Sequence, residues 1–427
     1  MKKQLFWSKL DHAAKIYPIL TSERFTYVFR VSATLNEEIN PEILHQAIKD
    51  SRKRFPSFFV RLKRGFFWYY FEENLKEPKL HEETAYVCKK LDEIHNHRYL
   101  FQFLFYNNRI SLEINHVLTD GAGAIAFLKS IVYHYLELIG KDIQPDDSIL
   151  LIGQPVDGEE LEDSYEKNYQ GGQIDPPKVP KAYIYNRKLV KKAGSGVINS
   201  FIDTKEFLTL VKASNSTITQ YIVALLIYSI IENGNKRKLK KHPVNICVPI
   251  NLRKAYKSKT LSNFSLYFHV SYQAQTEEPD FNDILNKVKK SFIEENNQVK
   301  IQSKIDTIYS LQKRYFIRLI PLPIKWIIFK IGYMAFGRKP TTVTFSNFGK
   351  VNIPKSLEKH IDSFSFYMGS GHKHAIAMNS YKNKTSIVFS RAIIDTDLER
   401  TFFNFLTDKK MNISLVSNYW ENKKIKI

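Results

Sequence analysis

The stretch that decides the fold covers residues 110–121 and reads ISLEINHVLTDG. Its first six residues alternate apolar and polar side chains, which predicts a half-buried strand. Residues 125–139 then carry apolar side chains at helical spacing, which predicts an amphipathic helix. His116 lies at the junction of the two elements, four residues before Asp120. A single imidazole held where a strand meets a helix is a candidate catalytic group.

Three short motifs, far apart in the chain, resemble one family. The first is His-x-x-x-Asp-Gly, formed by His116, Asp120 and Gly121; residues 248–253 read VPINLR and residues 344–349 read TFSNFG. In order and spacing they resemble the signatures of the chloramphenicol-acetyltransferase-like superfamily, nearest its branch of bacterial alcohol O-acetyltransferases and condensation domains. The resemblance covers essentially the whole chain. It implies an α/β fold in which two subdomains of this type pack as a pseudo-dimer around a central tunnel.

Strand and helix signals divide the chain into two halves joined by a long segment. Residues 1–150 are expected to form the N-terminal subdomain, which carries the histidine motif, and residues 195–427 the C-terminal subdomain. Residues 151–194 are rich in proline, glycine and acidic side chains and lack periodicity, which predicts a crossover. Strands are expected at residues 25–35, 58–62, 66–71, 99–106, 109–115, 197–202, 244–249, 266–272, 343–346, 364–368, 375–377 and 386–390, with helices after Asn40, Gly121, Thr204, Thr217 and Thr396.

Composition favours a cored enzyme without a membrane span or a disulfide framework. The chain is 43% hydrophobic and contains only two cysteines. Its N-terminus lacks the apolar core of a signal peptide, and no apolar run reaches the roughly 18–20 residues that span a bilayer. A cytoplasmic location is therefore the expectation.

The chain is strongly basic. It has 64 Lys and Arg residues against 43 Asp and Glu residues, which gives a net charge of +21. Such an excess of positive charge attracts anions. The alternative is that it reflects general lysine richness.

His116 is predicted to be the general base. A neutral imidazole with a pKa near 7 can take the proton of an alcohol hydroxyl as the oxygen attacks an acyl thioester. The resulting imidazolium can return a proton to the departing thiolate. The simpler alternative is a histidine that only satisfies a buried hydrogen bond.

The resemblance also implies roles for residues around His116. Asp120 would point away from the reacting atoms and pair with Arg253 from the other half, rather than complete a catalytic triad. Gly121 would allow a close approach or a tight helix start. Ser346 and Asn347 are candidates for donors to the oxyanion, although Ser-Asn-Phe-Gly is also ordinary turn chemistry.

Other reactive side chains are expected to be structural. Cys88 and Cys247 lie in apolar, strand-like contexts, so no acyl-enzyme is predicted. The pairs His95/His97 and His372/His374 lack a third ligand at useful spacing, so they are expected in exposed turns and no metal is predicted. Residues 315–336 are expected to form a core crossover helix with a proline-fixed entrance, or else to touch membrane or a lipidic acceptor.

The function that follows is acyl transfer from acyl-CoA, with acetyl as one candidate acyl group, to the hydroxyl of a small or lipidic alcohol. Acyl-CoA is a co-substrate, and the resemblance implies that its phosphates meet scattered Lys and Arg at the tunnel mouth. One alternative is a stand-alone condensation enzyme that takes its thioester from an acyl carrier protein and forms an amide or ester. A second alternative is a catalytically silent binding module. A monomer is expected, and no nucleic-acid motif is present.

Overall fold

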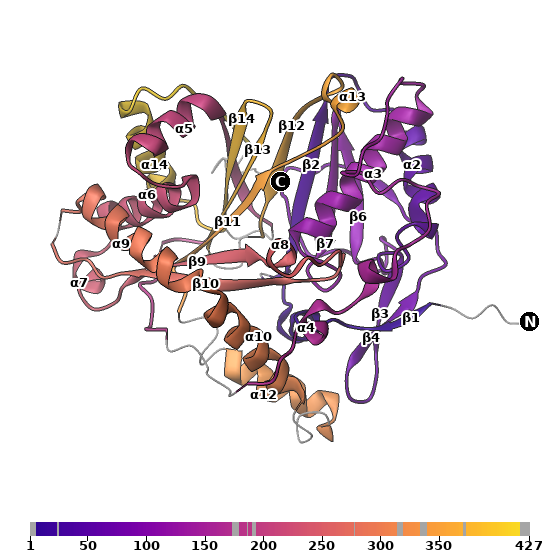
Figure 1. Ribbon diagram of the computed structural model, residues 1–427, viewed down its shortest axis with the longest axis horizontal. Helices are drawn as coiled ribbons and strands as arrows, with labels where there is room; N and C mark the ends of the chain where they lie inside the picture. The colour runs from indigo at the N-terminus through magenta and orange to yellow at the C-terminus, as the bar shows by residue number, and fades with distance from the viewer. Residues whose placement is uncertain are drawn as a thin grey trace, which may run out of the picture.

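Figure 1 presents a computed structural model of the chain. The structure describes residues 6–418, apart from residues 24, 173–178, 186, 190–193, 277, 314–318, 334–339 and 370–372. Two sheets with their helices form two lobes, which confirms the predicted α/β class with two sheet-bearing halves.

The first lobe is built on a five-stranded sheet in the order β12-β2-β7-β6-β5. Its strands are β2 (Val28–Leu35), β5 (Leu80–Glu82), β6 (Phe101–Tyr106), β7 (Arg109–Asn115) and β12 (Ile361–Tyr367). The predicted hairpin of β6 and β7 is confirmed, and Asn107 adopts the left-handed backbone (φ 50°) that such a tight turn requires. β2 begins three residues later than expected because Tyr27 also has a positive φ of 51°, which interrupts an extended strand.

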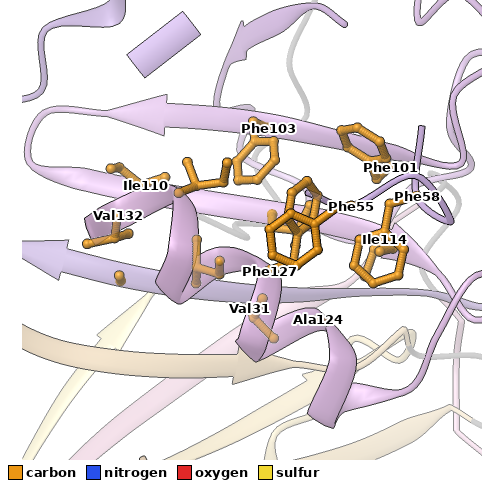
Figure 2. Packing of buried hydrophobic residues seen from close by; sticks show 14 of the residues in the cluster. Val31, Phe55, Phe58, Phe101, Phe103, Ile110, Ile114, Ala124, Phe127 and Val132 are labelled. Carbon is orange, nitrogen blue, oxygen red and sulfur yellow. The ribbon is translucent and has the colours of Figure 1, made fainter. Parts of the chain in front are cut away.

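Two helices pack on this sheet and fix the junction that carries His116. α2 (Pro41–Asp50) is capped by the side chain of Asn40, and α3 (Gly121–Leu138) packs on β2, β7 and α2. Phe127 of α3 lies among Phe55, Phe101 and Phe103, with ring centroids 4.8, 5.5 and 5.3 Å away (Figure 2). Because this aromatic cluster is fully buried, the start of α3 is held firmly against the end of β7.

The second lobe is built on a seven-stranded sheet in the order β10-β9-β11-β13-β14-β8-β15. Its strands are β8 (Gly196–Asp203), β9 (Val244–Asn251), β10 (Ser265–Tyr272), β11 (Val343–Lys350), β13 (His374–Tyr381), β14 (Lys384–Arg391) and β15 (Ile413–Ser417). The core helix α6 (Ile218–Asn233) begins with a capping box of Thr217 and Gln220. Around it lie α5 (Thr204–Ala213), α9 (Phe281–Glu295) and α14 (Asp397–Asp408).

Smaller elements complete the described chain. A three-stranded sheet joins β1 (Trp7–Lys9), β4 (Tyr69–Glu73) and β3 (Val60–Arg64). The remaining helices are α1 (Tyr17–Leu20), α4 (Ser164–Lys167), α7 (Lys236–Leu239), α8 (Arg253–Tyr256), α10 (Gln298–Lys313), α12 (Leu322–Gly332) and α13 (Lys355–Glu358), with short 3-10 turns at Ala14–Ile16, Ser51–Lys53 and Gly158–Leu161.

The C-terminal half contributes one strand to the sheet of the first lobe, so the sheets do not follow the expected division of the chain strictly. β12 comes from the C-terminal half yet pairs antiparallel with β2 along the edge of the first sheet, with Phe364 opposite Ala33. From β11 of the second sheet, Phe348 stacks on Phe366 of β12 with ring centroids 3.9 Å apart. The two lobes therefore share a core as well as a boundary.

The crossover between the halves is fastened to both of them. Glu160 forms a bidentate ion pair with Arg54 of the first lobe, with N–O distances of 2.6 and 2.7 Å. Its carbonyl accepts the N–H of Leu261, and the Tyr165 hydroxyl donates to the carbonyl of Ser265 at the start of β10. A segment without sequence periodicity is thus held to both lobes by specific side-chain and backbone contacts.

Candidate functional site

His116 follows the last residue of β7 and lies between two aromatic rings. Its ring centroid is 4.5 Å from that of Phe29 and 5.4 Å from that of Tyr17, and its N–H donates to the carbonyl of Tyr27 at 2.8 Å. The residue is partly exposed, although its Nδ1 atom is buried and forms no hydrogen bond of good geometry among the described residues. Part of the residue therefore remains accessible, whereas Nδ1 does not.

The surroundings of His116 favour the neutral ring. Burial lowers the pKa of His116 below its usual 6.5, against the opposing influence of the Asp120 charge, the Asn263 side chain and the Thr119 backbone. The sequence-based expectation of a pKa near 7 is corrected downward, because the aromatic walls desolvate the charged form. A neutral imidazole at pH 7 is the form that accepts a proton.

Asp120 holds the loop after His116 in place. One carboxylate oxygen caps α3 by accepting the N–H groups of Ala122 and Gly123 at 3.1 and 3.4 Å. The other accepts from Arg253 Nη1 at 2.8 Å and from the N–H of Phe264 at 2.9 Å. Burial would raise the pKa of this carboxyl, but the Arg253 guanidinium and these N–H donors hold it below its usual range.

Arg253 carries this contact to the second lobe. It begins α8, directly after β9, and its Nε and Nη2 atoms donate to the carbonyls of Thr260 and Ser262 at 2.8 and 2.5 Å. The side chains of Arg253 and Asp120 are only 13% and 7% exposed. A buried ion pair of this kind joins the histidine loop to the opposite lobe.

Gly121 lies where the two lobes touch. A Cβ atom built on Gly121 would be 2.0 Å from Cε1 of Phe348, so only glycine fits against this ring. Phe348 comes from β11, so the close approach is between the start of α3 and the second lobe. The residue is needed for its missing side chain rather than for an unusual backbone angle.

Gly121→Ala is expected to lower the free energy of unfolding by about 1–3 kcal/mol, the usual cost of forcing a methyl group into a packed contact. Chemical denaturation measures the loss. Gly158→Ala is the matched control, because a Cβ there meets nothing within 4 Å. Adding Phe348→Leu to Gly121→Ala should recover part of the loss. A Gly121→Ala protein as stable as the wild type would remove this steric role.

The two oxyanion candidates lie on opposite faces of β11. Asn347 donates from Nδ2 to Thr219 Oγ1 at 2.9 Å and accepts the N–H of Gly349, which places its side chain beside the start of α6. Ser346 points the other way, because successive side chains of a strand alternate. It pairs with Ala377, which belongs to the hydrophobic core of the first lobe. Ser346 therefore faces the lobe that carries His116.

Two residues that the sequence did not single out support the histidine from behind. Asn263 Nδ2 donates to the carbonyl of His116 and to Asp11 Oδ2, both at 2.9 Å. Asp11 also accepts the N–H of Ala14, and burial together with the nearby Asp163 raises its pKa to about 7. Neither residue belongs to a recognisable motif, and only the long-range contact between residues 11 and 263 identifies them.

Among the described residues, the cysteines and the other predicted histidines show no catalytic arrangement. Burial raises the pKa of Cys247 to about 12 and that of Cys88 well above its usual range, so both thiols stay protonated. His95 is exposed beside Asp92, as predicted. The prediction of an exposed turn is wrong for His374, which is buried as the first residue of β13, 3.5 Å from Glu399; His372 lies outside the described residues.

One sizeable pocket formed by described residues lies away from His116. A pocket of about 610 Å³ is lined by residues of α2 and of the segment around β5, including His45 and Pro78, and His116 is not among them. Over the described part of the chain, no single helix is long and apolar enough to cross a membrane. By length and composition alone, α5 and α6 together would be long and apolar enough, but the pair is bent by 77°.

Comparisons of sequence identify no relative, because no family model and no curated protein matches the chain. Solved structures do match. F. graminearum TRI101, complexed with coenzyme A and deoxynivalenol, has a TM-score of 0.64 at 10% identity over 96% of this chain and 99% of that one. The TRI3 trichothecene 15-O-acetyltransferase from Fusarium sporotrichioides has a TM-score of 0.59 at 11% identity over 93% of both chains.

This chain has the two-lobed fold of the chloramphenicol-acetyltransferase-like acyltransferases. The first condensation domain of the CDA synthetase shares it too, with a TM-score of 0.57 at 11% identity over 94% of this chain and 95% of that domain. The match extends over nearly the full length of each structure, so both lobes and their connection are included. The fold expected from the three motifs is therefore confirmed.

Proposed function

We propose that this protein is an acyltransferase that moves an acyl group from acyl-CoA to an alcohol hydroxyl by direct attack, with His116 as general base. The observation that carries the proposal is the neutral, partly exposed imidazole of His116 on a loop that the buried Asp120–Arg253 pair joins to the other lobe. A fold shared with acyltransferases supports the same conclusion.

The reaction needs one base and one oxyanion donor. His116 takes the hydroxyl proton through Nε2, because its Nδ1 atom is buried. The alcohol oxygen forms a bond to the thioester carbon, and the charge that develops on the carbonyl oxygen is stabilised by the Ser346 hydroxyl. The C–S bond then breaks, and the imidazolium returns its proton to the CoA thiolate. We place these groups in a tunnel between the lobes.

Coenzyme A is the proposed donor. F. graminearum TRI101 was crystallised with coenzyme A, and a chain with a net charge of +21 favours a polyanionic co-substrate. The likeness to a condensation domain supports a second candidate, in which an acyl carrier protein presents the thioester and an amide or ester is formed.

An assay of the purified protein decides between them. Acyl-CoA donors of increasing chain length are incubated with a library of alcohols and amines, and products are identified by mass spectrometry. Ester formation from free acyl-CoA supports the main proposal. Dependence on a loaded carrier protein supports the condensation reaction, and an absence of turnover with either donor supports a silent binding module.

A further inference from the structure

The helix α12 exposes an apolar face. Its sequence, residues 322–332, reads LPIKWIIFKIG, and only Leu322 and Lys325 are buried. The side chains of Ile324, Ile327 and Ile331 are each more than half exposed, and their spacing places them on one stripe. The expectation of a core crossover helix is therefore wrong for this part of residues 315–336, because the stripe faces away from the protein; residues 315–318 and 334–336 lie outside the described residues.

The tip of the β3–β4 hairpin extends this surface. The N–H of Leu322 donates to the carbonyl of Phe66 at 2.9 Å, and Lys325 Nζ donates to the carbonyl of Phe67 at 3.0 Å. The same ammonium group lies 3.8 Å from the ring centre of Trp68. We define the α12 platform by the exposed apolar side chains of both elements, together with Leu319 just before α12: Phe66, Phe67, Leu319, Ile324, Trp326, Ile327, Ile328 and Ile331.

The stretch of sequence that contains α12 carries basic residues but no acidic ones. The sequence contains no Asp or Glu between Asp306 and Glu358, whereas residues 313–339 contain seven Lys and Arg residues. Within the helix, Lys330 lies over the ring of Trp326 at 4.3 Å. Exposed aliphatic and aromatic side chains on a chain segment rich in lysine and arginine match the headgroup region of an anionic bilayer.

We propose that the α12 platform docks this protein on the surface of an anionic lipid bilayer. The helix would lie in the interface with its stripe among the headgroups, because 11 residues are too short to span a bilayer of about 30 Å. Phe66 at the hairpin tip, 70% exposed, provides a second point of insertion. Figure 1 places α12 and this hairpin at the same edge of the molecule.

The platform is connected to the surroundings of His116. α12 packs against α1, whose Tyr17 ring contacts the His116 ring. Tyr333, directly after α12, places its hydroxyl 3.3 Å from that of Tyr27, whose carbonyl accepts the His116 N–H. If the proposed acyl transfer is correct, docking through the platform would bring His116 near alcohols held in the bilayer, which makes a lipidic alcohol the acceptor class.

Co-sedimentation of the full-length protein with vesicles tests the docking. The wild type should sediment with vesicles of equal phosphatidylcholine and phosphatidylglycerol, bind pure phosphatidylcholine less, and be partly released by salt. Ile327→Gln/Ile331→Gln should weaken partitioning about tenfold or more, because both apolar anchors are lost. Ile94→Gln/Ile293→Gln, at two exposed isoleucines outside the platform, is the matched control and should bind like the wild type.

Three outcomes would overturn the docking proposal: a wild type that ignores anionic vesicles, a platform variant that binds as well as the wild type, or a wild-type dimer without vesicle affinity that the platform variant converts to a monomer. The last outcome would assign the surface to self-association. Vesicle binding is measured without substrate, so a failure of the docking proposal can be distinguished from a failure of the proposed acyl transfer. With a vesicle-embedded long-chain alcohol the platform variant should lose transfer, and with a water-soluble alcohol it should retain it.

Discussion

Replacing His116 with alanine is expected to lower turnover about a hundredfold to ten-thousandfold, the usual contribution of a positioned general base. The fold should survive, because the ring is partly exposed and lies beside Tyr17 and Phe29 rather than inside the main aromatic core. Acyl-CoA binding should also survive, since the imidazole acts on the acceptor's proton. Steady-state rates, circular dichroism and calorimetric titration with a CoA ester measure the three properties.

His95→Ala is the control for this change, because His95 is exposed and pairs with Asp92 in its own turn. It should retain full activity. Near-normal transfer by the His116→Ala protein, or a trapped acyl adduct on Cys88 or Cys247, would contradict direct attack.

The pH profile provides an independent check on the same residue. Since burial lowers the pKa of His116 below 6.5, the base becomes neutral and active as the pH rises through a range below 6.5. The rate should therefore climb on the acidic side and level off by neutral pH. A limb that rises only above pH 7 would assign the titration to another group.

Asp120→Ala and Arg253→Ala are expected to produce the largest losses of stability, about 3–5 kcal/mol each, because either change leaves a buried charge without its partner. Turnover should fall together with stability, since the same pair fixes the loop that carries His116. The double variant should lose less than the sum of the two single losses. Denaturant titration of all four proteins gives the coupling energy.

The exposed pair of Lys384 and Asp362 is the matched control for this cycle, with side chains 48% and 43% exposed. Its coupling energy should be about 0–1 kcal/mol, as for surface ion pairs in general. Additive losses at Asp120 and Arg253 would contradict the pairing.

The contribution of Asp120 to the free energy of unfolding should also depend on pH. Because the pKa of this carboxyl is lowered in the folded protein, the contribution is present at neutral pH and is lost as the pH falls through the titration of the carboxyl.

Local patterns were sufficient to predict the elements that carry the site. The alternation of residues 110–115, the two asparagines between β6 and β7, and the Thr217 cap of α6 each act over a few residues, so each is legible in one sequence. α9 was missed although its signal was present: Asp280 caps it, and Ile284, Leu285 and Val288 form its buried stripe.

What the sequence did not predict depends on partners far away in the chain. Nothing near Asp11 indicates its contact with Asn263, and nothing near residue 361 indicates that β12 joins the sheet of the other lobe. The prediction that α12 is a buried core helix was wrong for a related reason. An apolar helix predicts burial, but the number of neighbours that cover it is a property of the tertiary structure.

The position of β12 in the sequence also determines when the first sheet can be completed during synthesis of the chain. Leu35 leaves the ribosome near the start of synthesis, whereas its pairing partner Ile361 emerges only when most of the chain has been made. Until then the nascent first lobe carries the open edge of β2, a ready template for pairing with another chain. β12 therefore cannot join the sheet of the first lobe until most of the chain has been made, and of the strands in the two large sheets only β13, β14 and β15 are made later.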